Sequence, residues 1–311
     1  MKNVHKLTEG AILLTVFTVI LLITIYVPIL GAVINLFLSL PFIFFSAKNN
    51  RKESFVFLVA SLLLSLIVGT FLAIPLTLAY GLTGLVIGDF IRHKRGKGAG
   101  FIAGSITFLL NLVVQYAVAV AFFKVDFIKQ SMELFKQSIE QSKDLLSVLG
   151  QEPNAALFDQ FNSAIDTLQS LTPSLFVMAA CVAVFVIQLV SFPIVKRFGI
   201  KVEDSKPFRE LALPRNLLFY FLIALLLSLI LQPEIGSYLY LALTNIMFII
   251  QLVVLVQGLS FIWYISHLKG WPRAVPIIVT VLLFIMPILL YIVWILGIID
   301  LGFDLRKRIK K

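Results

Sequence analysis

The stretch YGLTGLVIGDFIRHKRGKGAGFIAGSITFLLNLVVQ, residues 80–115, decides the fold because two apolar runs flank a short basic turn. The runs cover residues 81–91 and 98–115, and the turn RHKRGK (92–97) holds four cations in six residues. Lys and Arg beside membrane helices are concentrated in cytoplasmic loops. The stretch therefore predicts a membrane hairpin with its turn in the cytoplasm.

Small and polar residues recur at helical spacing along both arms of this hairpin. Small residues three and four positions apart let helix backbones approach closely in lipid, where packing drives association. We therefore expect each arm to lie against a neighbouring helix. The positions are Thr77, Gly81, Gly84 and Gly88 for the first arm and Gly100, Gly104, Thr107, Asn111 and Gln115 for the second.

The composition excludes a soluble domain. Of 311 residues, 60% are hydrophobic and 14% are charged, whereas soluble domains carry about 25% charged residues. Several apolar runs exceed the roughly 18 residues that indicate a spanning helix, and membrane barrels show alternating patterns instead. The sequence predicts an all-α fold, a polytopic transmembrane bundle of eight to nine membrane helices.

Nine apolar runs are expected to form these helices. They cover residues 10–27, 31–47, 53–70, 74–91, 98–123, 173–195, 216–231, 237–266 and 274–303. The first run lacks a small-x-small cleavage site and is followed at once by another run, so we expect a retained span and no signal peptide. The basic residues predict a multi-pass protein of the bacterial cytoplasmic (inner) membrane, with a cytoplasmic amino terminus.

Residues 124–172 are the one sizeable polar segment. Four Lys against seven Asp and Glu give this segment a net charge of −3 (4 − 7), in a protein of net charge +10. Apolar residues recur at helical spacing on both sides of a break at Gly150, Pro153 and Asn154. We expect an amphipathic, extracytoplasmic helical hairpin.

Two basic segments of the carboxy-terminal half leave alternatives open. Residues 196–215 carry six basic and three acidic residues, which fits a cytoplasmic interfacial segment at anionic headgroups or an ordinary basic loop. The run 274–303 would make about 45 Å of helix, too little for two spans and more than one needs. It is either one long helix with the tail outside or a broken, re-entrant pair with the tail inside. The sequence favours nine helices with the last one kinked near Pro287, and leaves the side of the tail undecided.

No sequence pattern indicates an enzyme or a metal site. Walker A, H-E-x-x-H and G-x-S-x-G motifs do not occur. His5, His93 and His267 lie in separate basic flanks without an acid or cysteine at ligand spacing. The net positive charge is explained by the Lys and Arg residues of the predicted cytoplasmic loops, so it does not indicate nucleic-acid binding. We therefore expect no catalytic residue, no metal, no cofactor and no nucleic-acid partner.

Polar residues inside the membrane are costly and therefore suggest function. Their amides can line a cavity for a small polar solute, or they can form helix-to-helix hydrogen bonds, which is the commoner role for any single residue. Among acidic residues near helix ends, Asp89 is the best single candidate for a functional carboxylate. The candidate substrate-binding amides are Asn111, Gln115, Gln188, Asn245 and Gln251.

Several motifs resemble the YybS family of bacterial membrane proteins. They are KLTEGAILL (6–14), VPILG (27–31), LPFIFFSAK (40–48), LPRN (213–216) and GIIDLGFDLRKR (297–308), and they span nearly the whole chain. The resemblance implies a polytopic membrane protein and no defined activity.

The amino-terminal part in turn resembles the S components of energy-coupling-factor transporters. That resemblance implies six spans and a small-x-x-x-small face on the first helix that docks a membrane coupling subunit. The corresponding residues are Gly10, Ala11 and Thr15, and the Ala11-x-x-x-Thr15 pair departs from the alanine pair typical of S components.

These observations predict three regions and leave two function classes open. The regions are a five-helix membrane region (1–123), the outer hairpin (124–172) and a carboxy-terminal membrane region (173–311). One function is small-solute binding or transport, with a cavity among the fourth, fifth, sixth and eighth membrane helices. The other is a non-transporting interaction or scaffold protein of the envelope. The expected partners are the lipid bilayer, a small polar solute and a coupling subunit.

Overall fold

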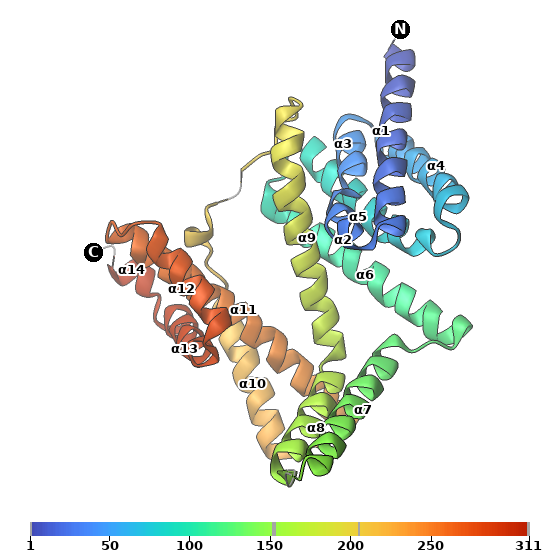
Figure 1. The fold of residues 1–311 in the computed structure, drawn as a ribbon. Helices are drawn as coiled ribbons and strands as arrows, with labels where there is room; N and C mark the ends of the chain where they lie inside the picture. The colour runs from blue at the N-terminus through green and yellow to red at the C-terminus, as the bar shows by residue number, and fades with distance from the viewer. Residues whose placement is uncertain (1, 151–153, 205, 310–311) are drawn as a thin grey trace. The chain divides into compact units, whose positions relative to one another are not determined.

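The computed structural model describes residues 2–150, 154–204 and 206–309. Every regular element in these ranges is a helix (Figure 1), which confirms the predicted all-α class. Seven helices are long and apolar enough to cross a membrane, and the number is eight if the bent pair of α12 (Ala274–Ile285) and α13 (Pro287–Phe303) counts as one span. The predicted count of nine is reached only if the short apolar helix α10 (Asn216–Leu231) also crosses.

The chain forms two compact units. Unit 1 comprises Met1–Phe127 and Leu175–Ser205, and unit 2 comprises Ile128–Ser174 and Lys206–Lys311. Unit 1 therefore takes its last helix from beyond the outer hairpin, from the part of the sequence that we assigned to the carboxy-terminal region. The predicted regions 1–123, 124–172 and 173–311 stay a prediction about domains.

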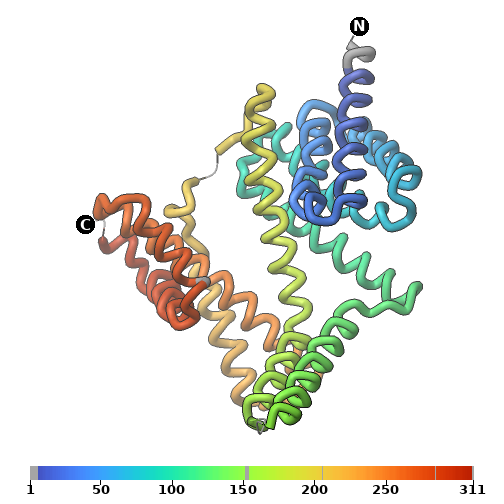
Figure 2. Tube along the Cα trace, in the orientation of Figure 1, coloured from blue at the N-terminus to red at the C-terminus, as the bar shows by residue number. Residues whose placement is uncertain are grey.

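Unit 1 contains six apolar stretches long enough to span. Its elements are α1 (Lys2–Tyr26), α2 (Pro28–Ile34), η1 (Asn35–Phe37), α3 (Leu40–Lys48), α4 (Arg51–Gly69), α5 (Ala73–Arg92), α6 (Lys97–Phe123) and, from Leu175 on, α9 (Thr172–Arg197). Figure 2 follows the chain through the first of these helices. The α3–α4 turn is fixed by a capping box, because Asn50 accepts from the Glu53 amide and Glu53 accepts from the Asn50 amide.

The glycine stripe of α5 packs against α3. A Cβ atom on Gly84 would lie 2.7 Å from the Ser39 carbonyl oxygen, and one on Gly88 would lie 2.6 Å from that of Ile43. These backbones meet because neither glycine has a side chain to separate them. Periodicity predicted this close contact but did not identify α3 as the partner.

The other glycines of the predicted stripes differ in how closely they are packed. A Cβ atom on Gly81 would lie 2.8 Å from Leu58 of α4. On α6, a Cβ atom on Gly104 would lie 3.1 Å from side-chain atoms of Ile87 of α5 and of Val184 of α9. Gly100 has ordinary contacts of 3.6 Å or more. The glycines of α6 are therefore packed less closely against their neighbours than those of α5.

Unit 2 contains the helical hairpin and the carboxy-terminal helices. Its elements are α7 (Phe127–Val148, from Ile128 on), α8 (Ala155–Ser170), η2 (Phe208–Glu210), α10, α11 (Tyr238–Leu268), α12 (Ala274–Ile285), α13 (Pro287–Phe303) and α14 (Leu305–Ile309). A 2.7 Å ion pair between Lys136 and Asp166 joins α7 to α8, which lie side by side in Figure 1. The helical hairpin is therefore present, and its side of the membrane stays a prediction.

α12 and α13 form a bent pair, with 117° between Ala274–Leu283 and Pro287–Phe303. Met286 interrupts the helix just before Pro287, whose ring cannot continue the preceding turn. The break lies at the proline where the sequence predicted a kink, but the kinked ninth span that the sequence favoured is replaced by two short helices. Neither α12, with 12 residues, nor α13, with 17, has the roughly 20 residues of an ordinary span.

α13 runs in the same direction as α11. Its first turns share a cavity with residues 248–255 of α11, and Asp300 near its end bonds to Gln257. Gly258 and Gly297 bring the two backbones together, since a Cβ atom on either would clash with a carbonyl oxygen of the other helix, that of Val293 or Val254. The chain therefore returns along α13 to the end of unit 2 at which α11 ends.

The basic tail lies at that same end. Arg306 bonds to the Arg209 carbonyl oxygen at 2.9 Å, and the Tyr264 hydroxyl donates to the Arg306 carbonyl at 3.3 Å. The contacts therefore support the re-entrant alternative, because the tail meets the basic segment that contains Arg209. A ninth single span would place the basic tail outside, whereas Lys and Arg are concentrated in cytoplasmic loops, and the re-entrant arrangement avoids this conflict.

Candidate functional site

Two of the five predicted amides, both on α6, form packing bonds in unit 1. Asn111 Nδ2 donates to the Thr107 carbonyl oxygen of its own helix at 2.8 Å. Gln115 Nε2 donates to the Pro75 carbonyl oxygen of α5, also at 2.8 Å. Neither side chain lines the cavities described below. The structure thus places both in helix packing.

Gln188 lies on α9 of unit 1, next to Gly100 of α6. The Gln188 Nε2 atom is buried and has no hydrogen-bond partner among the described residues. A Cβ atom on Gly100 would lie 3.6 Å from this nitrogen. We have no physical account of this unpaired donor.

Asn245 fastens the junction between α8 and α9 to α11. Its Oδ1 accepts from the Ser174 amide at 2.9 Å and the Ser174 hydroxyl at 2.6 Å. Its Nδ2 donates to the carbonyl oxygens of Ser170 and Leu241, both at 2.8 Å. Because helix ends leave backbone groups unpaired, one amide here satisfies the end of α8 and the start of α9. The hydrogen-bonding capacity of the Asn245 side chain is therefore taken up by helix packing.

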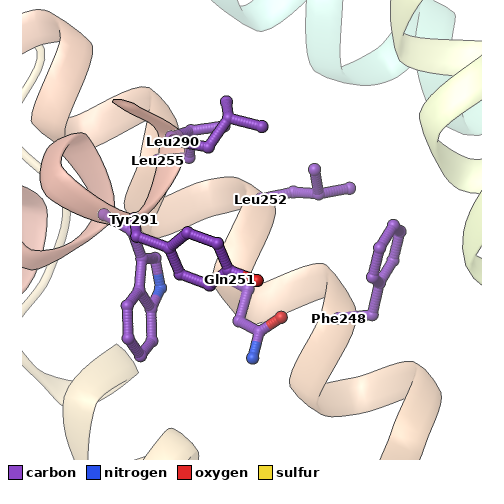
Figure 3. A pocket seen from close by; sticks show the side chains of 7 residues that line it. Phe248, Gln251, Leu252, Leu255, Leu290 and Tyr291 are labelled. Atoms are coloured by element: carbon purple, nitrogen blue, oxygen red, sulfur yellow. The ribbon is translucent and has the colours of Figure 1, made fainter. Parts of the chain in front are cut away.

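Gln251 is the one predicted amide that lines either of the two cavities described here. In unit 2, side chains of α11 and α13 line an open cavity of about 190 Å³ (Figure 3). Figure 3 shows Gln251, Leu252 and Phe248 along one wall and Leu290 and Tyr291 on the other helix. The lining residues are Phe248, Gln251, Leu252, Leu255, Leu290, Tyr291 and Trp294.

Polar groups on the wall of this cavity lack hydrogen-bond partners among the described residues. Trp294 Nε1 is buried and has no acceptor among the described residues. The exposed Gln251 amide likewise makes no hydrogen bond within the described part of the chain. In lipid an unpaired donor costs free energy, so an occupant that accepts from the indole N–H would stabilise this arrangement. The wall carries no charged residue.

A second polar centre of unit 2 surrounds Asp300, whose side chain is 2% exposed. Asp300 Oδ2 accepts from Gln257 Nε2 at 2.6 Å and from Arg306 Nε at 2.9 Å. Arg306 reaches back because Asp304, at φ 48°, ends α13 in a left-handed turn. The sequence did not single out Asp300, so this centre was missed. Sequence spacing gave no signal for it, because residues six apart do not face each other on a continuous helix and the pairing depends on the turn at Asp304.

Comparison with known proteins identifies the family. The family model described as "Predicted membrane protein (DUF2232)" matches residues 15–301. The chain is 31% identical over 314 residues to a protein of Bacillus subtilis (strain 168) described as "Uncharacterized protein YybS", and the match covers 100% of both chains. This chain belongs to the DUF2232 family. No solved structure matches it.

The resemblance to YybS is thereby confirmed for this DUF2232 member. The resemblance of its amino-terminal part to transporter S components stays a prediction. The family description says that the protein is a membrane protein and names no substrate. Function must therefore be inferred from the cavities and polar contacts of the structure.

Asp89, the acidic candidate of the sequence analysis, belongs to an ion cluster in this family member. Arg51 Nη2 lies 2.8 Å and Arg92 Nη2 lies 3.0 Å from the Asp89 carboxylate. Arg92 also donates to the Asn49 carbonyl oxygen at 2.7 Å. The cluster ties the α3–α4 turn to the end of α5, so the carboxylate is engaged in structure.

Unit 1 of the DUF2232 chain has a cavity of its own, about 630 Å³ in volume. It lies among α1, α3 and α9, and its lining includes Glu9, Phe44 and Phe198. Glu9 is paired with Lys48 at 2.6 Å. Across the described residues, no three His, Cys, Asp or Glu side chains come close enough to hold a metal ion.

Proposed function

We propose that this protein binds a small, uncharged, amphipathic solute in the cavity between α11 and α13. The observation that carries the proposal is the pairing of an apolar wall with two unpartnered polar groups, Trp294 Nε1 and Gln251. Ligand sites in proteins combine mostly apolar walls with a few placed polar groups. Of the two functions left open by the sequence, this geometry supports solute binding best.

The size and charge of the cavity narrow the solute. A volume of about 190 Å³ slightly exceeds the roughly 150 Å³ of an engineered protein cavity that binds benzene. No charged side chain lines it, and an ion would lose its hydration without compensation. The proposed ligand is therefore about the size of one ring and carries a hydrogen-bond acceptor.

The proposal includes membrane location and sidedness. The protein is a multi-pass protein, and we place it in the bacterial inner membrane with its amino terminus in the cytoplasm, on the charge rule. We assign no catalytic step to the site. Transport would need a coupling partner, and the exposed residues Ala11 and Thr15 of α1 offer a face for a membrane subunit.

Benzamide is a suitable probe because its carbonyl can accept from Trp294 and its amide can pair with Gln251. We expect it to raise the melting temperature of the purified protein saturably. Trp294→Phe and Gln251→Leu should each weaken binding about tenfold, the effect of one lost hydrogen bond. Gln115→Leu, which removes an amide outside the cavity, is the matched control.

Two results would contradict the proposal. One is equal benzamide affinity in wild type and all three variants. The other is the absence of any retained small molecule by native mass spectrometry, together with no response to benzamide.

A second candidate function, a non-transporting interaction protein, is favoured by one surface of α8. Leu157, Phe161 and Leu168 are 46%, 49% and 44% exposed, and with the exposed Ala164 they follow the 4-3-4 spacing of a helix–helix seam. A photo-crosslinking residue at Phe161 should then capture an envelope partner, and one at the exposed Thr167 should not. Equal capture at both positions would remove this alternative.

A further inference from the structure

The acceptors around Arg306 form a complete socket for a guanidinium group. Nε donates to Asp300 Oδ2 at 2.9 Å, Nη1 to the Arg209 carbonyl oxygen at 2.9 Å, and Nη2 to Ser260 Oγ at 3.1 Å. Each of the three nitrogens therefore has an acceptor. The cation also lies 5.4 Å from the Tyr264 ring centre, a position that favours a planar cation.

The side chains of this socket are oriented by groups other than Arg306. The Ser260 hydroxyl lies 2.7 Å from the Phe208 carbonyl oxygen and 3.0 Å from that of Leu211. Gln257 Oε1 accepts from the Leu213 amide at 3.0 Å, while its Nε2 donates to Asp300. Residues 208–213, α11 and α13 thus build the socket, and its arrangement does not require the tail.

Up to Ile309, where the described part of the tail ends, few other polar contacts hold the tail. α14 is five residues long and has no buried residue. Its remaining bonds lie near the surface: Lys307 with Asp304 at 2.9 Å, and the bond from Tyr264 to the Arg306 backbone. Arg215 also pairs with Asp304, whose side chain is 31% exposed. The Arg306 side chain is therefore the main polar attachment of the described part of the tail.

We propose that this socket is a guanidinium-binding site, which the chain fills with its own Arg306 and which accepts a small guanidinium compound when that side chain is withdrawn. The buried Asp300 carboxylate requires a cation, because an unpaired buried charge is strongly unfavourable. Three acceptors arranged around a planar fork select guanidinium over ammonium, which presents a point charge.

In this arrangement the tail is a tethered competitor. A short tether gives a linked group a millimolar or higher effective concentration, so the wild-type site stays closed to dilute guanidinium compounds. This site is separate from the cavity of the proposed function, since no residue that lines that cavity contributes to the socket. The two proposals can therefore fail independently.

The test uses the full chain with Arg306→Ala and the probe ethylguanidinium, with ethylammonium as the matched control. The variant should melt on the order of 10 °C below wild type, as expected when a buried ion pair is broken. Millimolar ethylguanidinium should restore most of this loss saturably, and ethylammonium should restore much less. The double variant Arg306→Ala/Asp300→Asn should not respond to ethylguanidinium, because it lacks the carboxylate. Lys307→Ala should melt like wild type.

Arg306→Lys provides a second route should the alanine variant fail to fold, because it keeps a cation in the socket. Ethylguanidinium should stabilise this variant and leave wild type unchanged. The proposal is wrong if ethylguanidinium and ethylammonium act equally, if neither acts on either variant, or if Arg306→Ala melts like wild type.

Discussion

Each unit contains an aspartate–arginine cluster near the end of a helix, and the two clusters differ in depth. In unit 1, Asp89 is 14% exposed and its partners Arg51 and Arg92 are 77% and 26% exposed. In unit 2, Asp300 is 2% exposed and Arg306 is 14% exposed. Water can solvate the partners of Asp89 if the cluster is disrupted, but it reaches the Asp300 centre poorly. The Asp89 cluster of unit 1 is therefore an ion cluster near the surface, whereas the Asp300 cluster of unit 2 is a buried ionic centre.

Loss of the Asp300 carboxylate should destabilise the protein far more than loss of the Asp89 carboxylate. Asp300→Ala should lower the free energy of unfolding by about 3–5 kcal/mol, because it leaves the Arg306 guanidinium unpaired in a largely dry site. Asp89→Ala should cost about 1 kcal/mol, since exposed pairs contribute little. Thermal unfolding of both variants in the same detergent measures the difference. Equal losses would show that depth does not distinguish the clusters.

Closely packed glycines in both units should also contribute to stability. Gly258→Ala should reduce the free energy of unfolding by about 1–3 kcal/mol, because the new methyl group would clash with the Val293 carbonyl oxygen. Gly84→Ala in unit 1 should cost a similar amount, since its Cβ atom would lie 2.7 Å from the Ser39 carbonyl oxygen. The control is Gly100→Ala, whose methyl group would have ordinary contacts. If all three variants gave the same folded yield, these close contacts would not stabilise the fold.

Removing the side-chain amides of Gln257 and Gln115 should change stability by smaller and unequal amounts. Gln257→Leu should destabilise unit 2 by roughly 2 kcal/mol, because the half-buried Leu213 amide and the buried Asp300 carboxylate would each lose a hydrogen bond. Gln115→Leu should cost about 0.6 kcal/mol, the average for a hydrogen bond between membrane helices. Denaturant titrations of the two variants measure both values. A larger loss for Gln115→Leu would reverse our assignment.

The smallest effect concerns Asp204 in the loop after α9. Hydrogen bonds from Lys97 and then Lys196 hold the Asp204 pKa below its ordinary value of 3.8. Since the folded pKa is the lower one, this stabilisation is present above the ordinary pKa and is lost as the pH falls through the depressed value. The carboxylate is 72% exposed, so Asp204→Asn should differ only slightly from wild type at neutral pH. The difference should vanish in acid, and a difference that grew as the pH fell would contradict the assignment.

The sequence predicted the helices well because lipid requires long apolar runs whatever their partners. The predicted runs 98–123 and 216–231 correspond to α6 (Lys97–Phe123) and α10 (Asn216–Leu231), for example. Periodicity also identified the closely packed face of α5. It could not name α3 as the partner, since a stripe of small residues has no information about which helix covers it.

The candidate site was harder to predict. All five amides are polar residues in apolar runs, and only their bonds distinguish the packing role of Asn245 from the cavity position of Gln251. The pairing of Asp300 with Arg306 depends on the left-handed turn at Asp304. A turn of this kind at a non-glycine residue is not evident from hydrophobic patterning.

The re-entrant pair of α12 and α13 returns the tail to the side of the basic segment, and both the cavity and the socket depend on this return. Cysteine labelling of intact cells can test it. Single substitutions Lys52→Cys, Ser147→Cys and Lys307→Cys are made in a Cys181→Ala background, since Cys181 is the one native cysteine. Lys307 is 83% exposed and suits the reagent. With an impermeant maleimide, we expect Ser147→Cys to be labelled, and Lys52→Cys and Lys307→Cys to be labelled only after permeabilisation. Labelling of Lys307→Cys together with Ser147→Cys in intact cells would contradict the account.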